Sequence, residues 1–304
     1  MRVSVVLCTY SLDAYEHFSE AAESVLAQTY DDVELVVVVD GNDDLHERVR
    51  EDYGNHESVV VHCNDENRGL SYSRNRGVEL ASGDVVAFMD DDAVADERWI
   101  EELVETYERH DALAAGGRMT PAWVAGEPDF LPPEFYWLIG VTYRGFPEEE
   151  TEVRNTFSSN LSFRREVFRE LGGFRPHMGK QGTNDLQGGE TELCARLREE
   201  YGEGVMYNPD AVVAHKVFPF RTRAPWMVER AFWQGYSKRM MQTETPGSIS
   251  RESTFLRQLL VRFIPERAYG LVRNPSVTGT KQFLTLLVLL GAVGVGYVYA
   301  IVDV

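Results

Sequence analysis

The chain has 304 residues, 43% of them hydrophobic, so it can bury one large core or two smaller ones. Its 30 Lys and Arg residues stand against 49 Asp and Glu, a formal net charge of -19 that argues against free nucleic acid as a partner. Only four of the bases are lysines, and an acid-rich, lysine-poor surface is typical of proteins that work in concentrated salt, which indicates a halophile.

Two features bear on where the chain resides. Cys8, Cys63 and Cys194 are odd in number and lack metal-ligand spacing, which fits a reducing cytosol. Met1-Arg2 leads directly into a strand-like run, so we expect no signal peptide.

The first 90 residues alternate between short apolar runs and helical patterns. Helices are expected at 14–28, in a segment that ends near Tyr53, and at 70–81. The apolar runs between them predict buried strands at 3–8, 33–39, 59–63 and 84–89. This alternation predicts an α/β domain with a parallel, doubly wound sheet and right-handed crossovers.

Polar residues follow three of these strands where each strand ends: Thr9, Asp40 and the run Asp90-Asp91-Asp92. Ligands of doubly wound sheets bind at the carboxyl ends of the strands. Three acids at a buried strand tip repel one another and lose solvation, so the run indicates a divalent cation. The alternatives are that the acids form a loop capping the next helix and that Asp40 is a helix cap. No dinucleotide or P-loop glycine motif occurs.

From residue 96 the pattern becomes mixed α and β. Glu190 and Glu192 open a predicted helix, where carboxylates are favoured by the helix dipole even without a catalytic role. His215 ends a predicted strand pair and is either a further metal or phosphate contact or a structural histidine. Asn160-Leu161-Ser162 matches a glycosylation sequon, which we interpret as chance because it lies in a core strand. The other predicted elements are a helix at 96–109, a strand at 112–118, a Pro- and Trp-rich excursion at 120–150, a strand at 156–163, a helix at 164–171 and a strand pair at 204–215.

The C-terminal third indicates a membrane. Residues 216–281 carry 12 bases and 4 acids, whereas residues 1–215 carry 18 bases and 44 acids. A helix is expected at 225–242, and another at 252–264 has an apolar stripe flanked by arginines and is broken by Pro265. The second helix either packs on the domain or lies in the membrane interface with its arginines on anionic head groups.

Residues 283–302 contain no charge and are about long enough to cross a bilayer. The bases that precede them predict a single-pass protein of the cell membrane with the residues before this segment in the cytoplasm. The alternative is a buried C-terminal helix.

Nine motifs in order resemble those of the family 2 glycosyltransferases, which share the GT-A fold. They are Val3 to Tyr10, Gln28-Thr29-Tyr30, Asp40-Gly41, Asn67 to Ser71, Arg74 to Gly77, Phe88 to Asp92, Asn160 to Arg165, Gly172-Gly173-Phe174 and Glu190 to Arg196. The composition and the apolar tail resemble the haloarchaeal members that build dolichol phosphate-linked glycans for protein N-glycosylation. The resemblance implies a GT-A domain at 1–220, divided into a nucleotide-sugar half at 1–118 and a mixed α/β acceptor half at 119–220, followed by a basic helical region at 221–281 and a transmembrane helix at 282–302.

The resemblance also implies roles for single residues. Thr9, Tyr10 and Asp40 would hold the nucleoside of a UDP-sugar, Arg74 would lie near the diphosphate, and Asp91 would lie near the sugar. Asp90 and Asp92 match the D-x-D pair that binds Mg²⁺ or Mn²⁺. Glu190 stands in the place of the general base, although Gly189 replaces the usual preceding acid, and Glu192 is the fallback base.

These roles predict an inverting transfer, because one base and no enzyme nucleophile give a single displacement at the anomeric carbon. The Q-x-x-R-W motif of processive synthases is missing, which favours transfer of one sugar. The expected acceptor is a polyprenyl or dolichol phosphate-linked glycan. By family analogy the donor sugar is a uronic acid such as glucuronic acid. Its carboxylate could meet Arg164, Arg165 or Lys180, and the alternative is that all three are surface charges.

Two other functions remain open from the sequence, and a third is disfavoured. One is a transferase for another lipid-linked or cell-surface polysaccharide, and another is a catalytically inactive glycan-binding scaffold. A sugar-nucleotide pyrophosphorylase would need a Gly-rich, basic loop after the first strand, which Ser11-Leu12-Asp13 does not provide.

Overall fold

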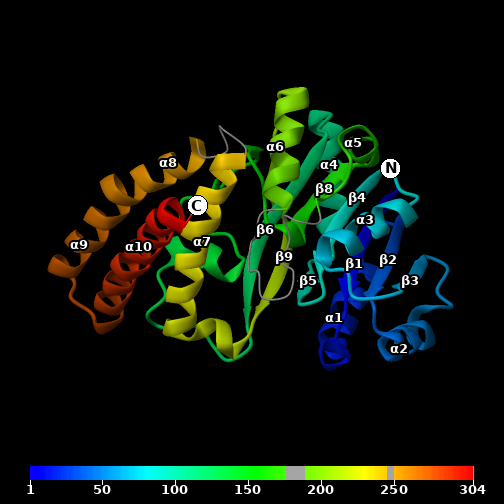
Figure 1. The fold of residues 1–304 in the computed structure, drawn as a ribbon, viewed down its shortest axis with the longest axis horizontal. Coiled ribbons are helices and arrows are strands. Elements are labelled where there is room, and N and C mark those ends of the chain that lie inside the picture. The colour runs from blue at the N-terminus through cyan, green and yellow to red at the C-terminus, as the bar shows by residue number, and fades with distance from the viewer. Residues whose placement is uncertain (176–188, 245–249, 304) are drawn as a thin grey trace. The chain divides into compact units, whose positions relative to one another are not determined.

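The computed structural model describes the backbone of residues 1–175, 189–244 and 250–303 (Figure 1). The contacts divide the chain into a first unit, residues 1–120 and 148–216, and a second unit, residues 121–147 and 217–304. Lys180, one of the bases expected near a sugar carboxylate, lies outside the described residues.

One mixed sheet forms the centre of the first unit. Its strands follow the order β3-β2-β1-β4-β8-β6-β9-β5, with β7 paired to β9. The pairs among β1 to β4 are parallel, whereas β4–β8, β6–β8 and β5–β9 are antiparallel. The strands are β1 (Val3–Thr9), β2 (Val33–Asp40), β3 (Val59–Asn64), β4 (Val85–Asp90), β5 (Ala93–Ala95), β6 (Ala114–Trp123), β7 (Thr151–Val153), β8 (Leu161–Arg164) and β9 (Val205–Val217).

The strand order reverses beside β1. The chain runs outward from β1 through β2 to β3 and then returns to the other side of β1 as β4. Cys8 pairs with Asp90 at the carboxyl ends of β1 and β4. In doubly wound sheets this switch point is where ligands bind, so the fold brings the predicted site residues of β1 and β4 together.

The helices of the first unit pack against this sheet. Gly77 allows close packing, because a Cβ there would lie 2.3 Å from the Val6 side chain of β1. The parallel pairing of β1 to β4, with helices between the strands, confirms the predicted doubly wound half, although many of the elements begin or end a residue or two from the predicted positions. The helices are α1 (Tyr15–Leu26), preceded by the 3₁₀ turn η1 (Leu12–Ala14), α2 (Asp43–Tyr53), α3 (Leu70–Leu80), α4 (Trp99–His110), α5 (Arg165–Leu171) and α6 (Gly189–Tyr201).

Two predicted strands differ from the structure. The expected pair at 204–215 is one long strand, β9. The strand expected at 156–163 begins only at Leu161, after the turn η3 (Ser158–Asn160). Asn160 explains that turn, because its buried amide donates to the backbone carbonyls of Arg118 at 3.1 Å and Ala211 at 2.8 Å. An amide in this position cannot be a glycosylation acceptor, as we expected.

The second unit is helical and includes part of the excursion. Glu134, fully buried in the 3₁₀ helix η2 (Pro133–Ile139), accepts hydrogen bonds from Arg267 at 2.8 and 2.7 Å and from Arg144 at 2.9 Å. This ion cluster ties residues 121–147 to the C-terminal helices, whereas we expected them in the domain of residues 1–220. The remaining elements are η5 (Pro219–Thr222), α7 (Ala224–Glu244), α8 (Ser250–Gln258), the π-helical turn η6 (Leu259–Phe263), α9 (Ile264–Arg273) and α10 (Val277–Asp303).

The prediction that Pro265 breaks the helix at 252–264 is wrong. The helix continues from α8 through η6 into α9. The N–H of Ile264 donates to the carbonyl of Leu259, five residues back, so the turn is widened just before the proline. Pro265 then stands in the first turn of α9, where its missing N–H and fixed φ are tolerated.

The C-terminal helix begins earlier than expected. Within the segment Val277–Val302 of α10, the most apolar window of 18 residues has a mean hydropathy of 2.2, and this is, by length and composition, the one helix in the described part of the chain that could cross a membrane.

Candidate active site

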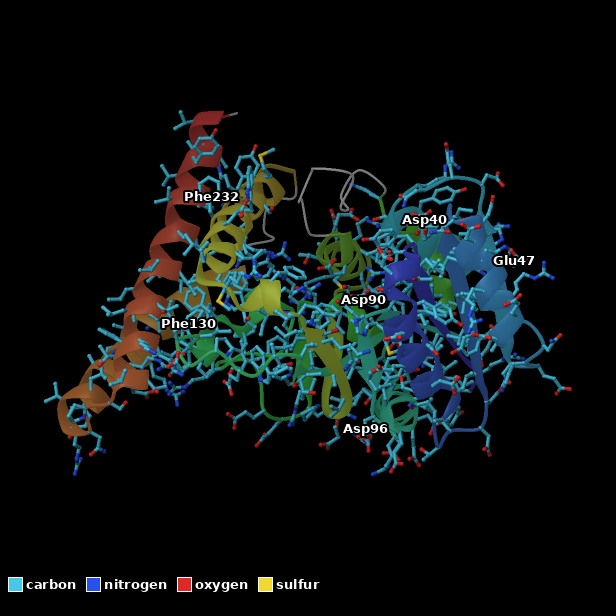
Figure 2. The ribbon with its side chains drawn as sticks, turned by 90° about the horizontal axis from the view of Figure 1, so that it is seen from below. Asp40, Glu47, Asp90, Asp96, Phe130 and Phe232 are labelled. Atoms are coloured by element: carbon cyan, nitrogen blue, oxygen red, sulfur yellow. The ribbon has the colours of Figure 1, made fainter. Side chains whose placement is uncertain are left out.

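Asp90 ends β4 with both its backbone and its side chain engaged. Its N–H donates to the hydroxyl of Ser159 at 2.9 Å, and its carboxylate accepts a hydrogen bond from Nη2 of Arg74 at 2.6 Å. Asp40 and Asp90, at the carboxyl ends of β2 and β4, are labelled in Figure 2. The predicted diphosphate contact and the predicted metal ligand are therefore direct neighbours.

Arg74 is rigidly held. It lies on α3, is buried, and its guanidinium carbon stands 5.8 Å from the ring centre of Phe88 and 5.7 Å from that of Phe174. The two rings pack edge to face 5.1 Å apart and form one aromatic surface beside the guanidinium, which limits its rotamers and attracts its charge. Arg74 thus brings a fixed positive charge to the acidic strand tip. Both aromatic residues belong to the sequence motifs, but their spacing in the sequence does not indicate this contact.

Asp92 and His215 meet across two strands. The antiparallel register of β5 and β9 sets Ala93 opposite His215, and Nε2 of His215 lies 3.3 Å from Oδ1 of Asp92. The N–H of Lys216 donates to the Asp92 carbonyl at 2.8 Å and fixes the same turn. Two neighbouring ligands of one octahedral cation at about 2.1 Å stand about 3 Å apart, so this pair fits Mg²⁺ or Mn²⁺.

Asp91 is the acid of the run whose pKa is raised by its surroundings. Burial raises its pKa to about 7, the charges of Asp92 and Asp90 add to the rise, and the hydroxyl of Thr9 opposes it. The Thr9 hydroxyl is buried and makes no hydrogen bond that meets the usual geometric criteria. The structure thus brings Thr9, at the buried end of β1, to the acidic run as predicted from the strand ends.

The described side chains do not form a complete metal cage. No group of three His, Cys, Asp or Glu within the described residues could hold a metal ion by itself. Asp90 is turned to Arg74, while Asp92 and His215 offer two converging ligands. A cation at this site would need further oxygen ligands, such as those of a diphosphate.

Asp40 is committed to the loop between β3 and α3. Its carboxylate accepts hydrogen bonds from Asn64 at 2.7 Å and from the N–H groups of Arg68 at 3.0 Å and Gly69 at 2.8 Å. The cap of α2 is Asn42, whose side chain accepts from Leu45 at 3.0 Å, so the interpretation of Asp40 as a helix cap is wrong. Tyr10 follows β1 with its side chain exposed.

The two candidate bases on α6 differ sharply. Glu192 is buried, and its carboxylate is gripped by Arg196 through two hydrogen bonds of 2.8 Å and by Arg175 at 3.1 Å. Both oxygens of this carboxylate already accept from guanidinium groups, so they are not placed to meet an acceptor hydroxyl. Glu190 lies half-buried in the first turn. The fallback assignment to Glu192 is therefore disfavoured, and the role of Glu190 remains a prediction.

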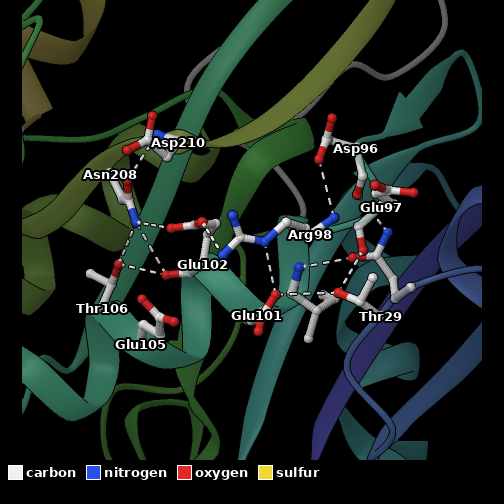
Figure 3. A network of polar contacts seen from close by, with 12 residues as sticks. Thr29, Asp96, Glu97, Arg98, Glu101, Glu102, Glu105, Thr106, Asn208 and Asp210 are labelled. Carbon is white, nitrogen blue, oxygen red and sulfur yellow. Dashed lines mark hydrogen bonds and ion pairs between the residues drawn. The ribbon is translucent and has the colours of Figure 1, made fainter.

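A polar network between residues 28–29 and residues 96–102 supports the segment that follows the acidic run 90–92. The side chain of Gln28 donates to the Asp96 carbonyl at 2.7 Å and accepts from the N–H of Ile100 at 2.9 Å. Figure 3 shows Thr29 and Arg98 in the same network, where Arg98 pairs with Glu101 at 2.9 Å and Glu102 at 3.0 Å. These contacts fix the start of α4, and with it the short strand β5 that follows Asp92. The motif Gln28-Thr29-Tyr30 thus acquires a structural role that spacing alone could not give.

Comparison with known proteins identifies the family. The model of glycosyl transferase family 2 matches residues 4–172. The chain belongs to this family. It is 51% identical over 302 residues to a glucosyl-dolichyl phosphate glucuronosyltransferase of Haloferax volcanii, across 99% of this chain and 96% of that one. It is 24% identical to the glycosyltransferase AglE of the same organism, across 94% and 90%.

Solved structures show the same fold. A mannosyltransferase of Pyrobaculum calidifontis, solved with GDP-Man and Mn²⁺, matches with a TM-score of 0.61 and 16% identity, over 98% of this chain and 87% of that one. TarS of S. aureus, solved with UDP-GlcNAc, matches with a TM-score of 0.57 and 17% identity, over 96% and 82%. These matches confirm the predicted GT-A-like fold.

Proposed function

We propose that this glycosyltransferase moves a single hexuronic acid, such as glucuronic acid, from a UDP-sugar to a dolichol or polyprenyl phosphate-linked glycan in protein N-glycosylation or surface glycan assembly. The observation that supports this chemistry is the cluster at the switch point, where Asp90 accepts a hydrogen bond from Arg74 and Asp92 lies beside His215. The substrates are supported by the relative in H. volcanii, whose name gives a glucuronosyl donor group and a dolichyl phosphate acceptor.

The residues of the cluster divide the work on the donor. Asp92, His215 and Asp90 would hold Mg²⁺ or Mn²⁺, which neutralises the charge that develops on a nucleoside diphosphate leaving group. Arg74 adds a second fixed positive charge at the same strand tip. Asp40 fixes the β3–α3 loop beside the nucleoside position, where Thr9 and Tyr10 would make the remaining contacts.

The acceptor side requires one base. In this proposal Glu190 takes the proton of the acceptor hydroxyl as the new glycosidic bond forms and the bond to the diphosphate breaks. No enzyme nucleophile intervenes, so the anomeric configuration inverts. Glu190 stands in the first turn of α6, where the positive end of the helix dipole favours a negative charge.

Both substrates suit an enzyme at the inner face of the cell membrane. UDP-sugars are water-soluble, and a lipid-linked glycan stays in the bilayer. The basic segment 216–281 would attract the anionic acceptor and the membrane surface. The apolar helix α10 would provide the attachment.

The test is incorporation of label into lipid. Membranes containing the chain are incubated with a panel of labelled UDP-sugars, and the lipid extract is analysed. We expect label from UDP-glucuronic acid in a lipid-linked product, with no product in EDTA or in Asp92→Asn. Incorporation from a different UDP-sugar would replace the proposed donor. UDP binding without any product would favour the inactive scaffold.

A further inference from the structure

The helix α10 has two different apolar faces. Leu286, Leu289 and Ala300 are buried against the rest of the second unit. A second stripe, spaced by three and four residues, is exposed along the whole helix. It consists of Leu284, Val288, Gly291, Val295, Val298 and Val302.

The buried face is covered by α7, which runs in the same direction (Figure 1). The two backbones approach closely at a pair of glycines: a Cβ on Gly235 would lie 2.0 Å from the Val293 carbonyl, and one on Gly296 would lie 1.9 Å from the Phe232 carbonyl. Phe232 lies between the two helices in Figure 2. The hydroxyl of Tyr297 continues the contact toward the ends of both helices by donating to Gln242.

This packing conflicts with a simple membrane crossing. Glu229 precedes Gly235 by six residues, about 9 Å along the helix, which sets it level with the middle of the apolar segment Val277–Val302. Glu229 is exposed. If α10 crossed a bilayer, α7 would carry this carboxylate, with Arg230 beside it, to the depth where charges are most costly.

We propose that α10 lies on the surface of an anionic bilayer and does not cross it. Its exposed stripe enters the boundary between head groups and acyl chains, while α7 keeps its charges on the protein side. The charge of the neighbouring helices fits anionic lipid, because residues 254–281 contain one acid, Glu266, against five bases. Of these bases, Arg257, Arg262, Arg273 and Lys281 are exposed. The anchor is thus monotopic, in place of the single-pass span expected from hydropathy.

The first test asks on which side α10 ends. Sealed vesicles with the cytoplasmic face outward are prepared from cells that make the full chain with a C-terminal epitope, and protease is added outside. We expect the epitope to be lost together with the catalytic domain, while a luminal marker stays intact. Survival of the epitope until detergent is added shows that α10 crosses and overturns the proposal.

The second test asks whether the exposed stripe binds lipid. Val295→Glu places a charge on the stripe, where Val295 is 61% exposed, and Val124→Glu is a matched control at a valine that is 53% exposed elsewhere in the unit. We expect at least a tenfold loss of binding to anionic vesicles for the first variant and wild-type binding for the second. Equal binding of both variants, or no binding by the wild type, overturns the proposal. Neither test measures sugar transfer, so a wrong donor assignment would leave the result interpretable.

Discussion

The ion pair between Arg74 and Asp90 predicts that replacing Arg74 will have opposite effects on metal affinity and on the rate of sugar transfer. Arg74 holds the carboxylate that a cation would need, at 2.6 Å, and the pair is mostly buried, with the Arg74 side chain 6% exposed and that of Asp90 28% exposed. In the protein without nucleotide, Arg74 therefore competes with the metal. Replacing it by glutamine should make Asp90 available and should also remove a repulsive charge.

The magnitude follows from the strength of the contact. A hydrogen bond between charged groups contributes about 1.5–3 kcal/mol, which corresponds to about a 10- to 150-fold change in an equilibrium constant. We expect Arg74→Gln to bind Mn²⁺ alone at least tenfold more tightly than the wild type. The same variant should transfer sugar more slowly, because the diphosphate loses its fixed positive charge.

The assay is a titration of nucleotide-free protein with Mn²⁺, with free metal followed by electron paramagnetic resonance. Arg76→Gln is the matched control, because it removes the same charge from the same helix. Arg76 contacts His62 and Glu79, and no described contact joins it to the acids of β4. If the two variants bind Mn²⁺ equally, or if Arg74→Gln binds it more weakly than the wild type, the competition argument is refuted.

Three further predictions concern the base, the core and the ion cluster. Glu190→Gln should lower kcat by about 10²–10⁴-fold in a product assay while UDP binding is retained, and a near-normal rate would place the base elsewhere. Gly77→Ala should lower stability by about 1–3 kcal/mol in thermal unfolding, because the new methyl meets Val6; an unchanged melting temperature would show that β1 and α3 separate easily. Glu134→Gln should lower the free energy of unfolding, measured by denaturant titration, by about 3 kcal/mol, because two arginines lose a buried charged partner. Burial works to raise the pKa of Glu134, but the hydrogen bond from Arg267 holds that pKa below its ordinary 4.5. The stability difference between wild type and Glu134→Gln should therefore shrink as the pH falls below 4.5. A difference that stays constant with pH would contradict this explanation.

The parallel half of the fold was predictable because its signals are local. Runs of valine such as 36–39 can be satisfied only by a strand buried on both faces, and the polar residue that ends each run marks the edge where ligands bind. The positions of Thr9 and Asp90 at one edge follow from that rule. The family assignment rests on the same short blocks.

The antiparallel half depends on contacts that are distant in sequence. The strand Ala93–Ala95 is only three residues long and has no periodicity, and it exists because it pairs with residues 213–215 of β9. That pairing is also what brings His215 to Asp92. The position of His215 at the end of a predicted strand therefore made it a candidate ligand, but the sequence could not show that it lies beside Asp92.

Carboxylates of the same type can also have opposite environments. Glu190 and Glu192 are indistinguishable as helix-opening acids in the sequence. In the structure Glu192 forms ion pairs with Arg196 and Arg175, and Arg175 lies outside the helix. Only the three-dimensional contacts show which acid is structural.

The acidic strand tip resolves its own repulsion in three ways, and these explain why metal and donor should bind together. Asp90 is neutralised by Arg74, Asp91 has a pKa near 7, and Asp92 stands beside His215. None of these arrangements offers three ligands to a cation before a nucleotide arrives. A diphosphate both supplies oxygen ligands and gives Arg74 an alternative anion, so it would release Asp90 as the metal enters. Tight Mn²⁺ binding by the wild type without UDP would contradict this coupling.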